Sequence, residues 1–116
     1  MVEKMLEEKF ANLGYLSKSN ELYLPVEVGL KLLEEGYRLG VAVIGVEFFH
    51  RKDGKIMPVE PLNGIDCSNL LNKYSDWRDV LNKCYDAVKA VLIMEKKRDD
   101  NQWCNLTFLK EQDWNK

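Results

Sequence analysis

The chain has 116 residues, a length typical of one domain that can bury a core without disulfides or a metal. Apolar residues make up 46% and charged residues 31%, which argues against both a disordered chain and an integral membrane protein. Seventeen basic and 19 acidic residues give a formal net charge of −2. This balance disfavours a strongly basic nucleic-acid-binding protein and a highly acidic DNA mimic.

The N-terminal residues, the apolar runs and the cysteines indicate the cellular compartment. Acids interrupt the N-terminal residues 1–8, where a signal peptide needs an apolar run, and the longest such run, Val41–Val46, is too short to span a bilayer. The cysteines Cys67, Cys84 and Cys104 form no CxxC pair, and the chain has one histidine. We therefore expect a cytoplasmic protein with reduced core cysteines, no metal, no cofactor and no membrane association.

The first half predicts two helices. Residues 2–13 have apolar side chains at helical spacing, residues 17–20 are typical of a loop, and residues 21–24 of a short extended piece. Pro25 then suits the first turn of a second helix that ends at Gly40. Gly29 and Gly36 each weaken that helix by roughly 1 kcal/mol relative to alanine, so we expect close packing there. The predicted inner stripe is Val26, Gly29, Leu30, Leu33 and Tyr37.

The segment Val41–Phe49 is the clearest strand. It is apolar at both alternating sets of positions until Glu47, which predicts that both of its faces are covered up to that point. Asp53 and Gly54 favour a turn, after which Ile56–Met57 can return as the second strand of a hairpin. Residues 61–66 are typical of a loop.

The second half predicts the longest helix and a last strand. A short helical turn follows Asp66 or Ser68, and Ser75 suits the N-cap of a helix that runs to Arg98. Trp103–Leu109 is a strand, and the alternate residues Cys104, Leu106 and Phe108 are expected on its buried face. Trp114 either packs back or marks a contact surface. The fold class is α+β: one small domain of about three helices on a short mixed or antiparallel sheet, with residues 1–24 an N-terminal helix and loop and residues 25–116 the core.

The sequence contains few groups that suggest catalysis. No phosphate-binding loop, metalloprotease motif or nucleophile elbow occurs. Glu47 and His50 both lie near the end of a predicted strand, where an acid/base pair is conceivable, although His50 also suits a surface hairpin turn. Cys67 lies near a helix start, where a thiolate is favoured. A small enzyme or ligand-binding domain that uses Glu47, His50 and Cys67 together is therefore one interpretation.

Acidic residues suggest a different role. A carboxylate that ends an apolar strand must reach solvent, find a cation or face a partner. Five further acids follow Glu47, mostly in predicted loops and at a helix start, with Tyr74 and Trp77 among them. Acids and aromatic rings on loops can dock a basic surface, although Trp77 also suits the core and acids at a helix start also favour its dipole. These acids are Asp53, Glu60, Asp66, Asp76 and Asp79.

The helix that ends in Gly40 and the strand after it resemble those of immunity proteins of the tRNA-cleaving colicin type. They also resemble related immunity proteins of bacterial polymorphic toxin and contact-dependent inhibition systems. In that family a helix leads into an apolar strand that ends in a fixed pattern: glycine, an apolar residue, an acid, two spacer residues and histidine. In this chain Gly45 matches the glycine, Glu47 the acid and His50 the histidine. The order of a long helix, a break and an apolar strand also matches residues 75–109. Phe48 and Phe49 stand where small residues are expected, and residues 1–24 are an addition.

The resemblance implies a cytoplasmic inhibitor without enzymatic activity. It would bind a cognate toxin C-terminal domain, a nuclease such as an RNase, and block its active site without touching nucleic acid itself. The toxin-binding residues would be Glu47 and His50 together with the acids named above. A homodimeric adaptor that associates through Val41–Phe49 or through the last strand is a further alternative. The identity of the toxin and the oligomeric state stay open.

Overall fold

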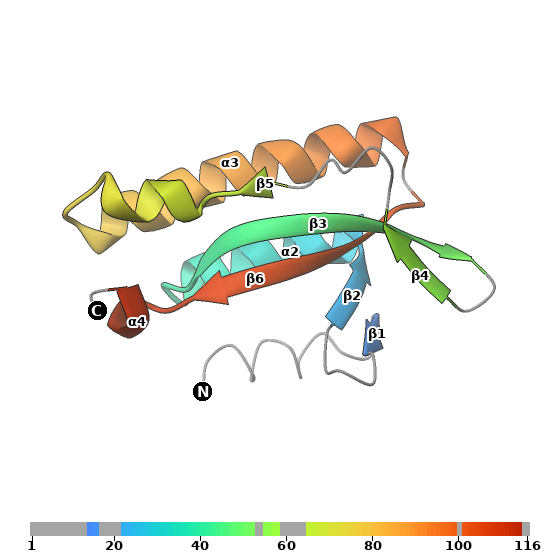
Figure 1. Cartoon of the computed structure of the whole chain (residues 1–116), viewed down its shortest axis with the longest axis horizontal. Helices are drawn as coiled ribbons and strands as arrows, with labels where there is room; N and C mark the ends of the chain where they lie inside the picture. Colours follow the sequence, from blue (N-terminus) through green and yellow to red (C-terminus); the bar gives the residue numbers. More distant parts are fainter. Residues whose placement is uncertain (1–13, 17–21, 53–54, 59–64, 100, 115–116) are drawn as a thin grey trace.

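The computed structural model describes residues 14–16, 22–52, 55–58, 65–99 and 101–114, and Figure 1 shows their arrangement. The helix predicted over residues 2–13 and the loop over 17–20 lie outside the described residues. Helices and strands combine into an α+β fold, as the sequence predicts. In chain order the elements are β1 (Tyr15–Leu16), β2 (Leu22–Pro25), α2 (Val26–Arg38), β3 (Ala42–Lys52), β4 (Lys55–Pro58), β5 (Ile65–Asp66), the 3-10 helix η2 (Ser68–Asn72), α3 (Trp77–Arg98), β6 (Trp103–Leu109) and α4 (Glu111–Trp114).

Strand β3 is the centre of the sheet. It pairs with β6 along one edge and with β5 and β4 along the other, and every pairing of described strands is antiparallel. The predicted return strand is confirmed as β4, and the turn at Asp53 and Gly54 lies outside the described residues. Because β4 pairs back from Phe49↔Pro58 to Lys52↔Lys55, β3 continues to Lys52 beyond its predicted end at Phe49.

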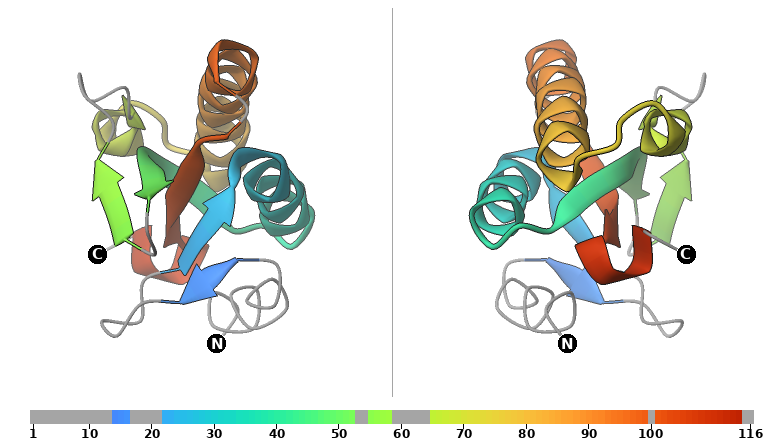
Figure 2. Two further views of the ribbon diagram at one scale, coloured as in Figure 1. Left: turned by 90° about the vertical axis from the view of Figure 1, so that its right-hand side faces the viewer. Right: turned by 90° about the vertical axis from the view of Figure 1, so that its left-hand side faces the viewer.

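Helices α2 and α3 cover the same face of the sheet (Figure 2). The buried apolar side chains of α3 recur at helical spacing and are Trp77, Val80, Leu81, Cys84, Val88 and Leu92. On α2, Leu32 and Gly36 are buried, whereas the predicted Leu30 and Tyr37 are half-buried. A Cβ atom on Gly29 would lie 2.5 Å from the Cys104 sulfur, which confirms the close packing expected at that glycine. The other face of β3 is not covered by α2 or α3.

Polar side chains fix the ends of α3. Its N-cap is Asp76 rather than the predicted Ser75, since the Asp76 carboxylate accepts a hydrogen bond of 3.0 Å from the Arg78 amide. At the other end, the Gln102 side-chain amide donates to the Glu95 carbonyl and carboxylate, each at 3.1 Å. The Val26 amide donates to the Gln102 carbonyl at 3.2 Å, so this buried cluster connects the end of α3 to the start of α2.

Trp114 packs back onto the domain. Its indole N–H donates to the Leu71 carbonyl at 2.8 Å, and its ring centroid lies 5.6 Å from that of Trp77. The Trp77 indole in turn donates to the Gly40 carbonyl at 3.1 Å. Trp77 is 7% exposed, so it belongs to the core, and the two rings connect α4, η2 and α3 at one end of the sheet.

Candidate functional site: the open face of the sheet

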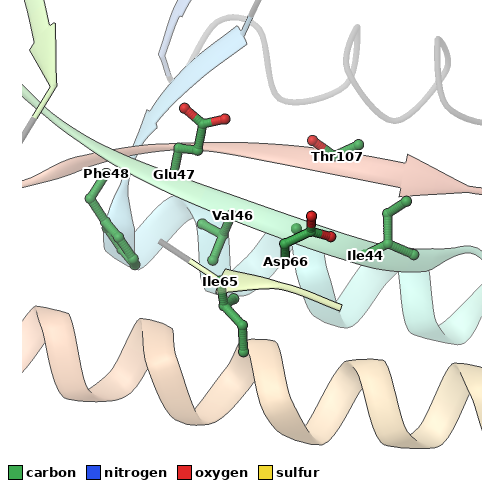
Figure 3. Close-up of a pocket in the computed structure, with 8 residues that line it drawn as sticks. Ile44, Val46, Glu47, Phe48, Ile65, Asp66 and Thr107 are labelled. Carbon is green, nitrogen blue, oxygen red and sulfur yellow. The ribbon is translucent and has the colours of Figure 1, made fainter. Parts of the chain in front are cut away.

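Glu47 lies on the face of β3 opposite α2 and α3, which the described helices leave open (called the open face below). Successive side chains of a strand point to opposite faces, and Val46 and Phe48 are each 1% exposed on the helix side. Glu47 between them is exposed and points away from α3 (Figure 3). The prediction that both faces are covered therefore holds for the buried residues Val41–Val43, while the open face from Ile44 onward is only partly covered.

A cavity of about 390 Å³ lies beside Glu47. The side chains of Glu47, Asp66 and Thr107 stand on the same open side of the sheet, while Val46, Phe48 and Ile65 point toward α3 (Figure 3). Gly45 forms part of the wall, where an added Cβ would lie 3.3 Å from the Ile65 carbonyl oxygen. The complete lining is Ile44, Gly45, Val46, Glu47, Phe48, Ile65, Asp66 and Thr107.

Strand β5 brings Asp66 to this cavity. Asp66 pairs with Gly45 of β3 and is exposed, so it belongs to a strand rather than to the predicted loop. Because Gly45 and Glu47 are two residues apart on β3, they share a face, and Asp66 lies diagonally across from Glu47. Two acids that the sequence singled out are thus brought to one surface.

An aromatic group borders the acidic part of the open face. Asn105 of β6 lies opposite Glu47, and Trp103 lies opposite Phe49. The Phe49 ring meets the Tyr23 ring edge-on at a centroid distance of 4.9 Å. No pattern in the sequence marks Asn105 or Thr107, because their place beside Glu47 depends on the register between β6 and β3.

Glu47 has no hydrogen-bond or ion-pair partner in the described part of the chain. Some carboxylates of the helices are paired instead: Glu34 meets Lys89 at 3.0 Å, and Glu95 meets Arg98 at 2.7 Å. An exposed carboxylate without a cation is free to pair with a cation of another molecule. This distinguishes Glu47 from the glutamates that fasten the helices.

His50 and Cys67 do not join Glu47. His50 is three residues further along β3, so its side chain leaves from the opposite face, and neither His50 nor Cys67 lines the cavity. Cys67 is 2% exposed, and its amide donates to the Ile44 carbonyl at 2.6 Å. Burial, with a smaller effect of Asp66, raises the pKa of the Cys67 thiol. The expectation of a favoured thiolate at Cys67 is therefore wrong.

The remaining predicted acids divide into two groups. Asp76 and Asp79 are exposed at the start of α3, on the helix-covered side of the sheet, and do not line the cavity. Asp53 and Glu60 lie outside the described residues. The structure thus brings together Glu47 and Asp66 and separates both from Asp76 and Asp79.

The described residues form neither a metal site nor a membrane-spanning helix. No group of three or more His, Cys, Asp or Glu side chains gathers there to hold a metal ion. None of the helices in the same residues combines the length and apolar character that a bilayer crossing requires.

Comparison of the chain with family models, with curated proteins and with solved structures finds no match.

Proposed function

We propose that this protein is an immunity protein that binds a cognate bacterial toxin domain, a nuclease, and covers its active site without catalysing a reaction. The observation that carries the proposal is the unpaired, exposed carboxylate of Glu47 beside Asp66 on the open face of the sheet. A nuclease groove that binds phosphates is basic, so carboxylates can take the place of the phosphates.

Two further features support this proposal. Gly45 and Glu47, which match the immunity-protein pattern, both line the cavity. The half-buried ring of Phe49, held edge-on by the buried Tyr23 ring, offers the kind of aromatic contact that anchors protein interfaces. His50, the third matching residue, is exposed on the opposite face, and the proposed contact surface does not include it.

The alternatives fit less of the described geometry. A ligand-binding domain or enzyme that uses Glu47, His50 and Cys67 requires one pocket that all three residues line. Of the three, only Glu47 lines the cavity. A homodimer through β3 would need a free edge, but β3 is paired on both edges. A homodimer through β6 stays a second candidate, because among the described residues β2 pairs with β6 only at Trp103 and Cys104.

The first test is a pull-down of the tagged protein from its host, followed by mass spectrometry and a nuclease assay. We expect a toxin domain at one-to-one stoichiometry whose RNA cleavage stops when the purified protein is added back. Absence of a toxin domain, despite its expression in the same cells, would overturn the proposal.

The second test measures the contribution of Glu47. The variant Glu47→Gln keeps the shape and removes the charge, so we expect the Kd for the toxin to rise at least about tenfold. Asp86→Asn on the exposed side of α3 is the charge-matched control and should leave the Kd unchanged. Equal affinities of both variants, with intact circular dichroism, would remove Glu47 from the interface.

A further inference from the structure

Helix α3 presents an exposed stripe on the side away from the sheet. In Figure 1 and Figure 2, α3 is the outermost element on the helix side of the sheet. Its buried residues, such as Val88 and Leu92, face inward. The residues four, seven and eleven positions after Asp86 fall with it on the opposite side of the helix. All four are exposed and are called the outer stripe below: Asp86, Ala90, Ile93 and Lys97.

The outer stripe is apolar in its middle and carries opposite charges at its ends. Ile93 is 38% exposed, and Met94 beside it is 56% exposed. Neither Asp86 nor Lys97 has an ion-pair or hydrogen-bond partner in the part of the chain that the structure describes. An acid, an apolar centre and a base are thus all available to another molecule.

The spacing of the outer stripe fits the symmetry of two identical helices. When two copies of a helix cross antiparallel about a two-fold axis, every contact between two different residues occurs twice. An axis midway between Ala90 and Ile93 is also midway between Asp86 and Lys97 along the chain. One arrangement therefore places Asp86 of each copy against Lys97 of the other, and the small Ala90 against Ile93.

Other arrangements of the same helices bring like charges together. A parallel pair would place Asp86 against Asp86 and Lys97 against Lys97. An antiparallel pair with its axis at Ala90 would place Lys83 against Lys97. The steps of four, three and four residues in the outer stripe are those of a coiled-coil seam. The charges therefore favour the first arrangement, because like charges that face each other across an interface are unfavourable.

We propose that the outer stripe of α3 is a self-association surface, on which two copies of this chain pack antiparallel with Asp86 of each copy on Lys97 of the other. Because α3 and the open face lie on opposite sides of the sheet, both open faces of the dimer stay accessible. The inference does not depend on the proposed toxin binding. A contact along one helix is smaller than the roughly 1,600 Å² of typical stable complexes, so we expect a weak dimer with a Kd on the order of 10–100 µM.

Sedimentation equilibrium of the full chain is the first test. We expect the average mass to rise from 13.5 kDa toward twice that value as the protein concentration passes through the expected Kd. Added salt should reverse the rise in part, because the end contacts are ion pairs. A mass that stays at 13.5 kDa up to a concentration of about 1 mM would overturn the proposal.

Charge reversal identifies the surface. Lys97→Glu and Asp86→Lys should each raise the dimer Kd at least about tenfold, since each change brings like charges together at both ends of the contact. A mixture of the two variants should form a mixed dimer, because every facing pair is again of opposite charge. One chain that carries both changes should dimerise like the unchanged protein.

The matched control is Lys31→Glu, which makes the same charge change on the exposed side of α2 and should leave the dimer Kd unchanged. If Lys97→Glu weakens the dimer no more than this control does, the dimer forms through another surface, such as β6, and the proposal is wrong. Lys97→Glu should also leave the Kd for the toxin unchanged, so the proposed function and the self-association can fail separately.

A zero-length cross-link tests the antiparallel orientation. Along one α3 the rise of 1.5 Å per residue separates Asp86 from Lys97 by about 16 Å, too far for a direct amide within one chain. A carbodiimide condenses a carboxylate directly with an amine. We expect it to yield a dimer whose peptide map joins the Asp86 peptide to the Lys97 peptide. A cross-linked dimer without this pair of peptides would overturn the proposed arrangement.

Discussion

The two faces of the sheet differ although they are formed by the same strands. On the helix side, the alternate residues Val46 and Phe48 of β3 are each 1% exposed. The backbone of α2 at Gly29 lies so close to the Cys104 side chain of β6 that a larger residue would clash. On the open side, Glu47 is exposed and Phe49 is half-buried. Side chains on the helix side must therefore fit a fixed volume, whereas side chains on the open side can differ in charge and polarity to suit a partner.

Adjacent phenylalanines give the largest expected contrast. Phe48→Ala would empty a fully buried position, and we expect a loss of about 3–5 kcal/mol of unfolding free energy. Phe49→Ala removes a half-buried ring and its edge contact with Tyr23, for about 1 kcal/mol. Urea unfolding with constant m-values would measure both. Equal losses would show that the two faces are equally packed and would break the comparison.

A smaller effect is expected where α2 meets β6. In Gly29→Ala the new methyl group would press on the Cys104 sulfur, at a cost of about 1–3 kcal/mol that the higher helix propensity of alanine offsets only in part. Cys104→Ala removes that sulfur. We therefore expect the double variant to lose less unfolding free energy than the two single variants lose together, by about 1 kcal/mol or more. Additive effects in thermal or urea unfolding would show that the two sites do not press on each other.

The smallest effect concerns the outer surface of the helices. The Tyr85 hydroxyl donates to the Glu34 carboxylate at 2.6 Å and, with Lys89, lowers the pKa of Glu34 from its ordinary 4.5. A lowered carboxyl pKa stabilises the fold above the ordinary pKa, and this stabilisation disappears as the pH falls through the lowered value. Because Glu34 is about half exposed, Glu34→Gln should cost about 0.5 kcal/mol or less at neutral pH.

The pH profile supplies the check on that variant. The difference between Glu34→Gln and the unchanged protein should vanish as the pH falls below 4.5. A difference that persists in acid would mean that the side-chain shape, not its charge, sets the effect.

The main helices and the longer strands could be predicted because their patterns are local. Helical spacing marked α2 and α3, and apolar alternation marked β3 and β6. The two-residue strand β5 has no local signal, since it exists only by pairing with the edge of β3. Asp76 and Ser75 are both good capping residues one position apart, so the sequence did not decide which one caps α3.

The site was less predictable than the fold, because most of its residues meet only through strand pairing, which no local pattern shows. Glu47 was recognisable because it interrupts an apolar strand. Asp66 reaches Glu47 only through the pairing of β5, and Thr107 does so only through the register of β6. The break in register between Val43 and Gly45 shifts every later neighbour of β3, and no local pattern in the sequence announces it.

The placement of the tryptophans gives the protein two separate optical reporters. Trp103 lies on the open face opposite Phe49, whereas Trp77 and Trp114 pack against each other, with tilted rings, at the end of the sheet near α4. Contact at the open face would change the emission of Trp103, and detachment of the C-terminal segment would change that of Trp77 and Trp114. Single replacements by phenylalanine would separate the two signals, so that binding and local opening can be followed in one cuvette without a label.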